Sequence, residues 1–276
     1  MSAVAHAALQ ARWRPAPLVT GSIALHGVAF LGAVLGPEEW IWWALSAVAA
    51  NQAGLTALGM WPRSTLLGPN FTRLPGASAA RGEIAFTFDD GPDAEVTPQV
   101  LDILDAFNVR ATFFCIAEKA RGNPELCREI ARRGHIVENH SSGHHATFAM
   151  LGLRGIRREI TEAQRMLGEI TGRSPRFFRP PAGLRNPLLD PVLHDLNLRL
   201  VSWTRRGYDT QRSNDEGVTR RLLRGLAAGD ILLLHDGHSA RTPDGKHVVL
   251  AVLPRLIEAA HQRGLHPVTL DQAIDP

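Results

Sequence analysis

The stretch Thr87-Phe88-Asp89-Asp90-Gly91-Pro92 follows the strand-like run Glu83-Ile84-Ala85-Phe86, so two adjacent carboxylates stand where a predicted strand gives way to a turn. In the middle of a strand, neighbouring side chains point to opposite faces of the sheet. At a strand end this alternation breaks, and both acids can face one site. One carboxylate can then bind a metal while the other acts as a base, as metal-assisted hydrolysis requires. Asp-Gly and Gly-Pro are also ordinary turn formers, so a simple turn explains this stretch equally well when it is taken alone.

Three further motifs carry chemistry. His140-Ser141-Ser142-Gly143-His144 places two imidazoles at i and i+4, which share one face if the segment is a helical turn. Arg179-Pro180-Pro181-Ala182-Gly183 predicts a rigid loop that begins on an arginine. Leu232-Leu233-Leu234-His235-Asp236 is typical of a buried strand that ends on a histidine.

Asp90, His140 and His144 together offer one oxygen and two nitrogen ligands to a metal ion. Such a set leaves coordination positions open for water and for a substrate carbonyl. Zinc suits this mixture, and the carboxylate also suits Co, Mn or Ni. The sequence therefore predicts a divalent metal site, with zinc as the leading candidate.

The order and spacing of these motifs resemble the NodB-type polysaccharide deacetylases, which form carbohydrate esterase family 4. That family has TFDDGP, then H-x3-H, then R-x-P, then a segment with an Asp, then L-x-H. The resemblance covers about residues 82 to 272. It implies an irregular (β/α)7 barrel, the NodB homology domain, and hydrolysis of N-acyl groups on amino sugars.

The resemblance also implies roles for single residues. Asp89 corresponds to the general base that takes a proton from the attacking water, and the positive charge of Arg179 should keep it ionised. His235 corresponds to the general acid that protonates the leaving amine. Asp209 matches the family's orienting aspartate, although the surrounding D-x-x-D-W pattern is not kept, since Arg206 replaces its first Asp and Thr210 its Trp.

Two residues are expected to contact substrate. Many relatives carry Tyr after R-x-P, where this chain has Ala182. Alanine keeps the backbone N–H that helps to hold the oxyanion, while the missing ring should reshape the sugar subsite. Leu233 is expected to line the acyl pocket, or else to pack in the core. His145, His238 and His247 are not expected to belong to the site.

The composition limits the remaining possibilities. The chain has 276 residues, of which 45% are apolar, with two cysteines and a formal charge of +3. Cys115 and Cys127 lie on a predicted strand and helix without a CxxC spacing, so they are expected to fill the core. The arginines are not interleaved with aromatic residues, so nucleic-acid binding is not expected.

The N-terminal quarter differs from the rest. Leu18–Leu35 and Trp40–Met60 contain no Asp, Glu, Lys or Arg. Each is long enough to cross a hydrocarbon core of about 30 Å at about 1.5 Å per residue. Trp40, Trp42, Trp43 and Trp61 lie near the ends of the spans, as in an interfacial belt. We expect residues 1–61 to form a transmembrane hairpin rather than a signal peptide, with His26 and Asn51 serving only helix packing.

Charges near the spans predict their orientation. Arg12 and Arg14 precede the first span, Arg63 and Arg73 follow the second, and the connecting turn carries Glu38-Glu39. The positive-inside rule places both outer flanks in the cytoplasm. A multi-pass protein of the bacterial inner membrane, with its catalytic domain on the cytoplasmic side, is therefore expected.

Helix and strand signals alternate after a Pro- and Gly-rich linker predicted at 62–81, which leaves 82–276 as the catalytic domain. Strands are expected at 84–88, 111–116, 136–138, 176–178, 199–203 and 231–234. Helices are expected to begin at Thr97-Pro98 and Asn123-Pro124 and to span 155–171 and 248–263. Repeated βα units predict a parallel sheet covered by helices. Six candidate site residues fall just past predicted strands, as in barrels, whose active sites lie at the carboxyl ends of the strands: Asp89, Asp90, His140, Arg179, Asp209 and His235.

The expected function is hydrolysis of an N-acetyl or other N-acyl group from an amino sugar, releasing acetate. The membrane hairpin favours an envelope glycan or a lipid-linked amino sugar as the substrate. An O-deacetylase or another non-peptide amide hydrolase on the same scaffold is one alternative. A catalytically inactive, membrane-tethered glycan-binding module is the other.

Overall fold

Strand β1 (Glu83–Asp89) lies in the middle of the sheet and ends on the first of the two adjacent acids. The computed structural model describes residues 12–274. In it, β1 pairs in parallel with β2 (Thr112–Cys115) on one side and with β7 (Ile231–His235) on the other. Its first residues also pair with β8 (His266–Pro267). The predicted TFDDGP strand is thus an interior strand of the sheet, with paired neighbours on both sides.

The sheet continues outward from this centre in the order β5-β4-β3-β2-β1-β7-β6, and its neighbouring strands are parallel. Its outer strands are β3 (Ile136–Asn139), β4 (Phe177–Phe178), β5 (Arg199–Leu200) and β6 (Arg205–Arg206). The sheet ends at β5 on one side and at β6 on the other. The predicted parallel α/β architecture is confirmed, in the form of a curled half-barrel.

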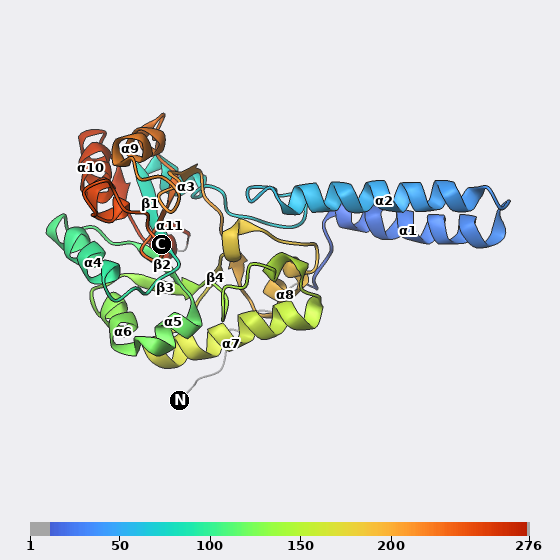
Figure 1. Ribbon diagram of the computed structural model, residues 1–276, viewed down its shortest axis with the longest axis horizontal. Coiled ribbons are helices and arrows are strands. Elements are labelled where there is room, and N and C mark those ends of the chain that lie inside the picture. The colour runs from blue at the N-terminus through green and yellow to red at the C-terminus, as the bar shows by residue number, and fades with distance from the viewer. Residues whose placement is uncertain (1–11, 275–276) are drawn as a thin grey trace.

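Helices cover the outer face of this sheet (Figure 1). The longer ones are α4 (Val96–Ala106), α6 (Pro124–Arg132), α7 (Leu153–Thr171), α9 (Asp215–Leu223) and α10 (Val248–Gln262). Shorter helices connect them: α3 (Gly76–Ala80), α5 (Ala117–Gly122), η1 (Phe148–Met150), η2 (Pro181–Gly183), α8 (Leu189–Asp195) and α11 (Leu270–Ile274). The helices predicted at 155–171 and 248–263 are confirmed, whereas α8 and α9 were not predicted.

The alternation along β1 separates two cores. Phe86 and Phe88 point outward and pack with the helices in a large cluster that also holds Cys115 and Cys127. Ala85 points inward and packs with Leu233 and other residues in a smaller cluster inside the curl. Both cysteines are buried and unbridged, so the prediction that they fill the core is confirmed.

The start of α4 differs from the prediction. The helix begins at Val96, and Thr97 lies within its first turn instead of capping it. The Thr97 hydroxyl accepts a hydrogen bond from Asp93 N at 2.7 Å and donates to Asp236 Oδ2 at 2.6 Å. Its oxygen is therefore used to fix the loop after β1 to the loop after β7.

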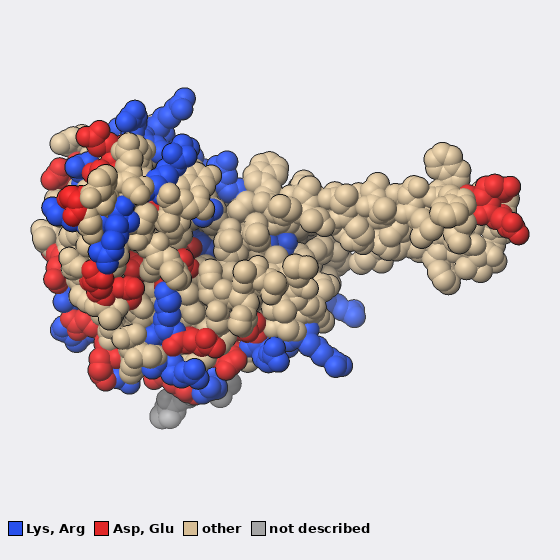
Figure 2. All heavy atoms as spheres, in the orientation of Figure 1, with Lys and Arg blue, Asp and Glu red and all other residues tan. Residues whose placement is uncertain are grey.

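Two long helices, α1 (Pro17–Leu35) and α2 (Trp40–Gly59), lie side by side and project from the domain (Figure 1). Their surface is free of charge until the acidic turn at the far end (Figure 2). Asn51 Nδ2 donates to Ser22 Oγ at 2.8 Å, which ties the two helices together as expected. Among the described residues, α1 alone is long and apolar enough to span a membrane by length and composition, a property that signal anchors share.

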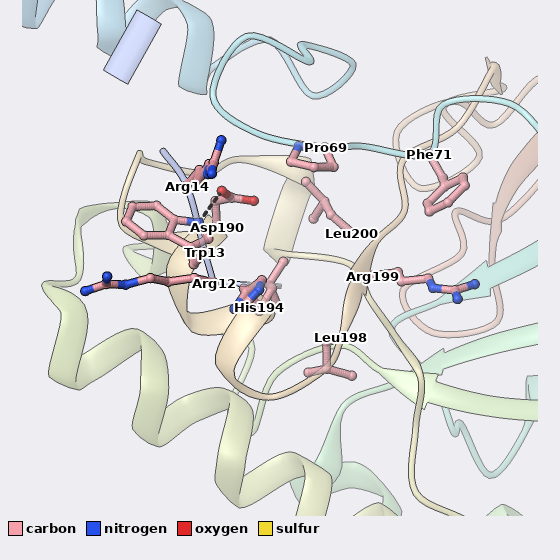
Figure 3. A pocket seen from close by; sticks show the side chains of 11 residues that line it. Arg12, Trp13, Arg14, Pro69, Phe71, Asp190, His194, Leu198, Arg199 and Leu200 are labelled. Atoms are coloured by element: carbon pink, nitrogen blue, oxygen red, sulfur yellow. Dashed lines mark hydrogen bonds between the residues drawn. The ribbon is translucent and has the colours of Figure 1, made fainter. Parts of the chain in front are cut away.

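The near end of this helix pair packs tightly on the domain. Gly59 O accepts a hydrogen bond from Arg185 N at 3.1 Å, and a Cβ at Gly59 would lie 2.1 Å from Arg185 O. Before α1, Trp13 Nε1 donates to Asp190 Oδ2 at 2.9 Å on α8 (Figure 3). Both chain segments at the base of the helix pair are therefore fixed to the domain.

The segment predicted as a linker also packs on the domain. Leu67 and Leu74 are buried, and Phe71 forms an isolated parallel bridge with Val201 next to β5. Residues 62–81 therefore hold the helix pair and the sheet together through many contacts. They do not behave as a free tether.

Candidate active site

The predicted site residues converge at the carboxyl ends of the parallel strands. Asp89 is the last residue of β1 and His235 the last of β7, and the two are register partners on adjacent strands. His140 follows β3 and Arg179 follows β4. Asp209 lies three residues beyond the end of β6, a strand that the sequence did not reveal. The fold therefore brings together residues that are far apart in the sequence.

Asp90, His140 and His144 form a cluster whose ligand atoms all lie within 4.8 Å of one another. Asp90 Oδ1 is 3.2 Å from His140 Nε2 and 3.1 Å from His144 Nε2. These are the three residues that the sequence predicted as metal ligands. The mixture of one carboxylate and two imidazoles is a donor set that divalent transition metals accept.

The surroundings of these atoms fit a metal ion. His140 Nδ1 lies 2.7 Å from Arg179 O, a carbonyl that can only accept, so Nδ1 carries a proton and Nε2 is the ring nitrogen that faces Asp90. Burial lowers the pKa of His144 to about 4, which keeps its ring neutral. Asp90 Oδ1 is buried without a hydrogen-bond partner. Asp90 Oδ1 and the two imidazole Nε2 atoms therefore converge as three donors that could hold one divalent metal ion.

The two histidines do not lie on a helical turn, and the prediction was wrong on this point. Residues 140–144 form an irregular loop in which Ser141 has φ 67° and His144 has φ 52°. The two rings are nevertheless only 4.9 Å apart. The residues with left-handed φ values turn the loop back on itself, so the two side chains come together without a helical turn.

Asp89 is held by Arg179. Arg179 Nη1 donates to Asp89 Oδ1 at 2.6 Å, and Asp89 Oδ2 lies 3.8 Å from His140 Nε2. Oδ1 is thus hydrogen-bonded to Arg179, while Oδ2 faces the Asp90–His140–His144 cluster. This is the geometry that a base beside a metal needs, because the free oxygen can accept a proton from a water in the cluster.

Arg179 is fully buried, and each nitrogen of its guanidinium donates at least one hydrogen bond. Nη1 also donates to Thr87 Oγ1 at 2.9 Å, Nε donates to Val201 O at 3.1 Å, and Nη2 donates to Ser202 O at 2.8 Å. The guanidinium also lies 4.1 Å from the centroid of the Phe114 ring. The sequence placed Arg179 at the mouth of a loop, whereas in the structure it fills the interior of the curled sheet.

His235 and Asp209 form the second buried pair. Asp209 Oδ1 lies 2.9 Å from His235 Nδ1, and Asp209 Oδ2 accepts from the backbone N–H of His235 at 2.8 Å. Burial acts to lower the pKa of His235, but the charge of Asp209 and its hydrogen bond outweigh burial and raise this pKa to about 9. His235 is therefore protonated at neutral pH, as a general acid must be.

A cavity of about 140 Å³ is lined by Asp90, His140 and His144 and by the proposed base and acid, Asp89 and His235. Ala182 lines it and has φ 54°, a left-handed conformation that is uncommon for alanine. Leu233 also lines it from β7 while its side chain is buried in the inner core. Ala182 and Leu233, the two residues predicted to contact substrate, thus both line the cavity. Leu233 also packs in the core, so it fits both of its predicted roles.

His238 was not expected in the site, yet it lines the cavity. Its Nδ1 lies 3.4 Å from Asp90 Oδ2. His145 and His247 lie away from it as expected, next to Glu159 and Glu95 respectively. His238 occurs in a loop where its own φ is 59°, and no sequence pattern marks such a backbone turn.

The two departures in the Asp209 segment also lie at the cavity. Arg206 and Thr210 both line it, in the positions where the resembling family has Asp and Trp. The exchange of an acid for an arginine reverses a charge next to the reaction centre.

The same fold and motifs occur in known proteins. Residues 77–201 match the model of the polysaccharide deacetylase family. A peptidoglycan-N-acetylglucosamine deacetylase of Bacillus cereus is 34% identical over 69% of this chain and 67% of its own length. A chitooligosaccharide deacetylase of Sinorhizobium fredii is 32% identical over 69% of this chain and 91% of its own length. The crystal structure of the Bc1960 peptidoglycan N-acetylglucosamine deacetylase superposes with a TM-score of 0.67 at 29% identity, covering 74% of this chain and 92% of that one.

The chain therefore belongs to the polysaccharide deacetylase family. Enzymes of this family are hydrolases that cleave the amide bond of N-acetyl groups and depend on a metal. Within it, the chain is an enzyme that acts on non-peptide carbon–nitrogen bonds, and Asp90, His140 and His144 offer it a candidate metal site.

Proposed function

We propose that the protein removes N-acetyl groups from an amino sugar of an envelope glycan or of a lipid-linked precursor, releasing acetate. One observation carries this proposal. The Asp90–His140–His144 cluster, Asp89 and His235 line a single small cavity, and Arg179 and Asp209 are hydrogen-bonded to the last two. A metal site, a base and an acid around one cavity provide what amide hydrolysis requires.

The side chains act in a definite order. Asp89 Oδ2 takes a proton from the attacking water, whose oxygen adds to the acyl carbon, and Arg179 holds the carboxylate in place. The backbone N–H of Ala182 is available to the oxyanion that develops. His235 then gives its proton to the amide nitrogen as the C–N bond breaks. Acetate and the free amine leave, and Asp209 supports the imidazolium before that transfer.

We propose Asp90, His140 and His144 as the ligands of a divalent metal, most simply zinc, with Co, Mn or Ni as alternatives. Bound there, the metal would polarise the acyl carbonyl and lower the pKa of a water molecule. His140 keeps its orientation through the contact of Nδ1 with Arg179 O. The same arginine therefore supports both the base and one of the ligands.

The test is hydrolysis by the purified full chain, measured as acetate release from several N-acetylated glycans with and without added metals. Chitooligosaccharides and peptidoglycan fragments are suitable first substrates, because the relatives named above act on them. An O-acetylated glycan lacking N-acetyl groups distinguishes O-deacetylation. Turnover of that glycan alone would reassign the reaction, and no turnover of any substrate by the metal-loaded protein would favour a glycan-binding role.

We also propose that residues 1–61 anchor the protein as a hairpin in the bacterial inner membrane, with the catalytic domain of residues 82–276 joined through 62–81 on the cytoplasmic side. The uncharged, exposed surface of the helix pair supports insertion (Figure 2). The arginines at its base and Glu38-Glu39 at its tip support the orientation. Reporter fusions at the C-terminus, one active only in the cytoplasm and one only outside, test it. An external signal would reverse the orientation, and a protein recovered without membranes would exclude the hairpin.

A further inference from the structure

A second hollow opens next to the catalytic cavity, and we call it the arginine groove. It has a volume of about 520 Å³, and Ala182, Trp203 and Arg206 line both it and the catalytic cavity. At its other side it is lined by Met60 and Trp61, just beyond the end of α2. The arginine groove therefore extends from the reaction centre to the base of the apolar helix pair.

The charged side chains that line the arginine groove are all positive. Its lining includes Arg63, Arg205, Arg206 and Arg221, and no Asp or Glu is among the described residues that line it. Arg205 is paired with Asp230. Within residues 12–274, no carboxylate lies within ion-pair distance of the other three arginines. Like charges gathered without a counter-ion repel one another, and an anion placed among them relieves that repulsion.

Two of these arginines, Arg206 and Arg221, lie over aromatic rings. The Arg206 guanidinium lies 4.9 Å from the centroid of the Tyr208 ring and 5.4 Å from that of Trp203. Arg221 lies 5.4 Å from the same tyrosine ring. Stacking leaves the edge of a guanidinium, where its N–H donors lie, directed away from the ring. Arg206 Nε is buried and has no hydrogen-bond partner, so this guanidinium has a donor unused within the part of the chain described.

We propose that the arginine groove binds the phosphate of a lipid-linked amino sugar, so that the substrate is an N-acetylated sugar joined through phosphate to a membrane lipid. The proposal rests on the proposed deacetylase function and specifies its substrate. Because the groove and the catalytic cavity share Ala182, Trp203 and Arg206, a sugar in the cavity can extend its neighbouring substituent into the groove. A phosphate is the anion that several arginines bind best, and the position of the groove beside α2 lets the lipid part continue toward the membrane.

The experiment compares three substrates with the full chain in detergent micelles. These are N-acetylglucosamine joined to an isoprenyl chain through phosphate, the matched isoprenyl glycoside without phosphate, and N-acetylglucosamine 1-phosphate without lipid. We expect kcat/KM to be at least about 10-fold higher for the phosphate-linked lipid than for the matched glycoside. The lipid-free phosphate should lie between them. Equal rates for the two lipids would overturn the proposal.

Arg221 offers a matched pair of variants on one helix. Arg221→Ala should remove about 10-fold of the preference for phosphate, because a charge-assisted hydrogen bond is lost. Arg220→Ala removes the same charge from the adjacent exposed position, which does not line the groove, and should leave the preference unchanged. Arg221→Lys should restore part of it. Equal effects of Arg220→Ala and Arg221→Ala would assign the preference to net charge and overturn the site.

A binding measurement separates failure of the groove from failure of the deacetylase function. Calorimetric titration of the Asp89→Asn variant, whose turnover should be slower by roughly 10²–10⁴-fold, compares N-acetylglucosamine 1-phosphate with N-acetylglucosamine. Tighter binding of the phosphate that is lost in the Asp89→Asn, Arg206→Ala double variant supports the groove even if no acetate is released. Equal binding of the two sugars overturns the inference and leaves the deacetylase proposal standing.

Discussion

Arg179 Nη1 lies 2.6 Å from Asp89 Oδ1, and both side chains are buried at the centre of the curled sheet. This pair links the fold to the chemistry, because Arg179 also donates to backbone carbonyls of the chain after β5. Arg179 thus joins the proposed base to the chain that follows β5. A change at Arg179 must therefore affect stability and activity together.

Arg179→Met tests this link. The variant leaves the Asp89 carboxylate buried without its partner, so we expect the free energy of unfolding to fall by about 3–5 kcal/mol. Thermal unfolding of the full chain measures the loss. The double variant Arg179→Met, Asp89→Asn has no unpaired charge and should recover part of the stability without activity. A double variant less stable than the single one would contradict the pairing.

The Asp209–His235 pair should determine the alkaline limit of activity. His235 has a pKa of about 9 and is protonated below it, so kcat should fall as the pH rises through about 9. In Asp209→Asn the stabilising charge is gone while burial remains, so the pKa of His235 falls. The alkaline limb should then move to lower pH, and a pH–rate profile of both proteins measures the shift. An unmoved limb would mean that another group sets it.

The ligand assignment predicts a loss of metal. Asp90→Ala, His140→Ala and His144→Ala each remove one of three donors, so each variant should bind metal weakly and be inactive. Elemental analysis after dialysis measures occupancy. His145→Ala is the matched control, because His145 lies beside Glu159, and it should keep the metal. Full occupancy in one of the first three variants would remove that residue from the ligand set.

Asp89→Asn should separate catalysis from metal binding. The amide keeps the shape of the side chain but cannot accept the proton, so kcat should fall by roughly 10²–10⁴-fold. Metal content should stay near that of the parent, since Asp89 is not among the clustered ligands. His235→Ala should behave in the same way for the proton donor. Near-normal turnover in either variant would contradict its assigned role.

The sequence predicted those parts of the fold and site that short-range patterns determine. The run into Asp89-Asp90 and the run into His235 are both apolar and end on chemically active residues, so β1 and β7 and their site residues could be found. The spacing of His140 and His144 indicated proximity correctly. The predicted backbone conformation was wrong, because a loop with left-handed residues can bring the two rings together as well as a helical turn can.

Other features depend on contacts that no local pattern reveals. Strand β6 consists only of Arg205 and Arg206, so it lacks the apolar pattern by which a strand is predicted. It forms because it pairs with β7. His238 reaches Asp90 only through the conformation of its loop. The closeness of Arg206, Tyr208 and Arg221 likewise arises when α9 packs beside β6.

The contact between Gly59 and Arg185 sets how far the enzyme can reach. Any side chain at residue 59 would collide with the backbone of residue 185, so the domain meets the end of α2 in one orientation. With α1 and α2 in a bilayer, the catalytic cavity stays at a constant height and tilt above the headgroups. On the proposed membrane placement, the protein would select acyl groups by their distance from the bilayer before any contact with the sugar.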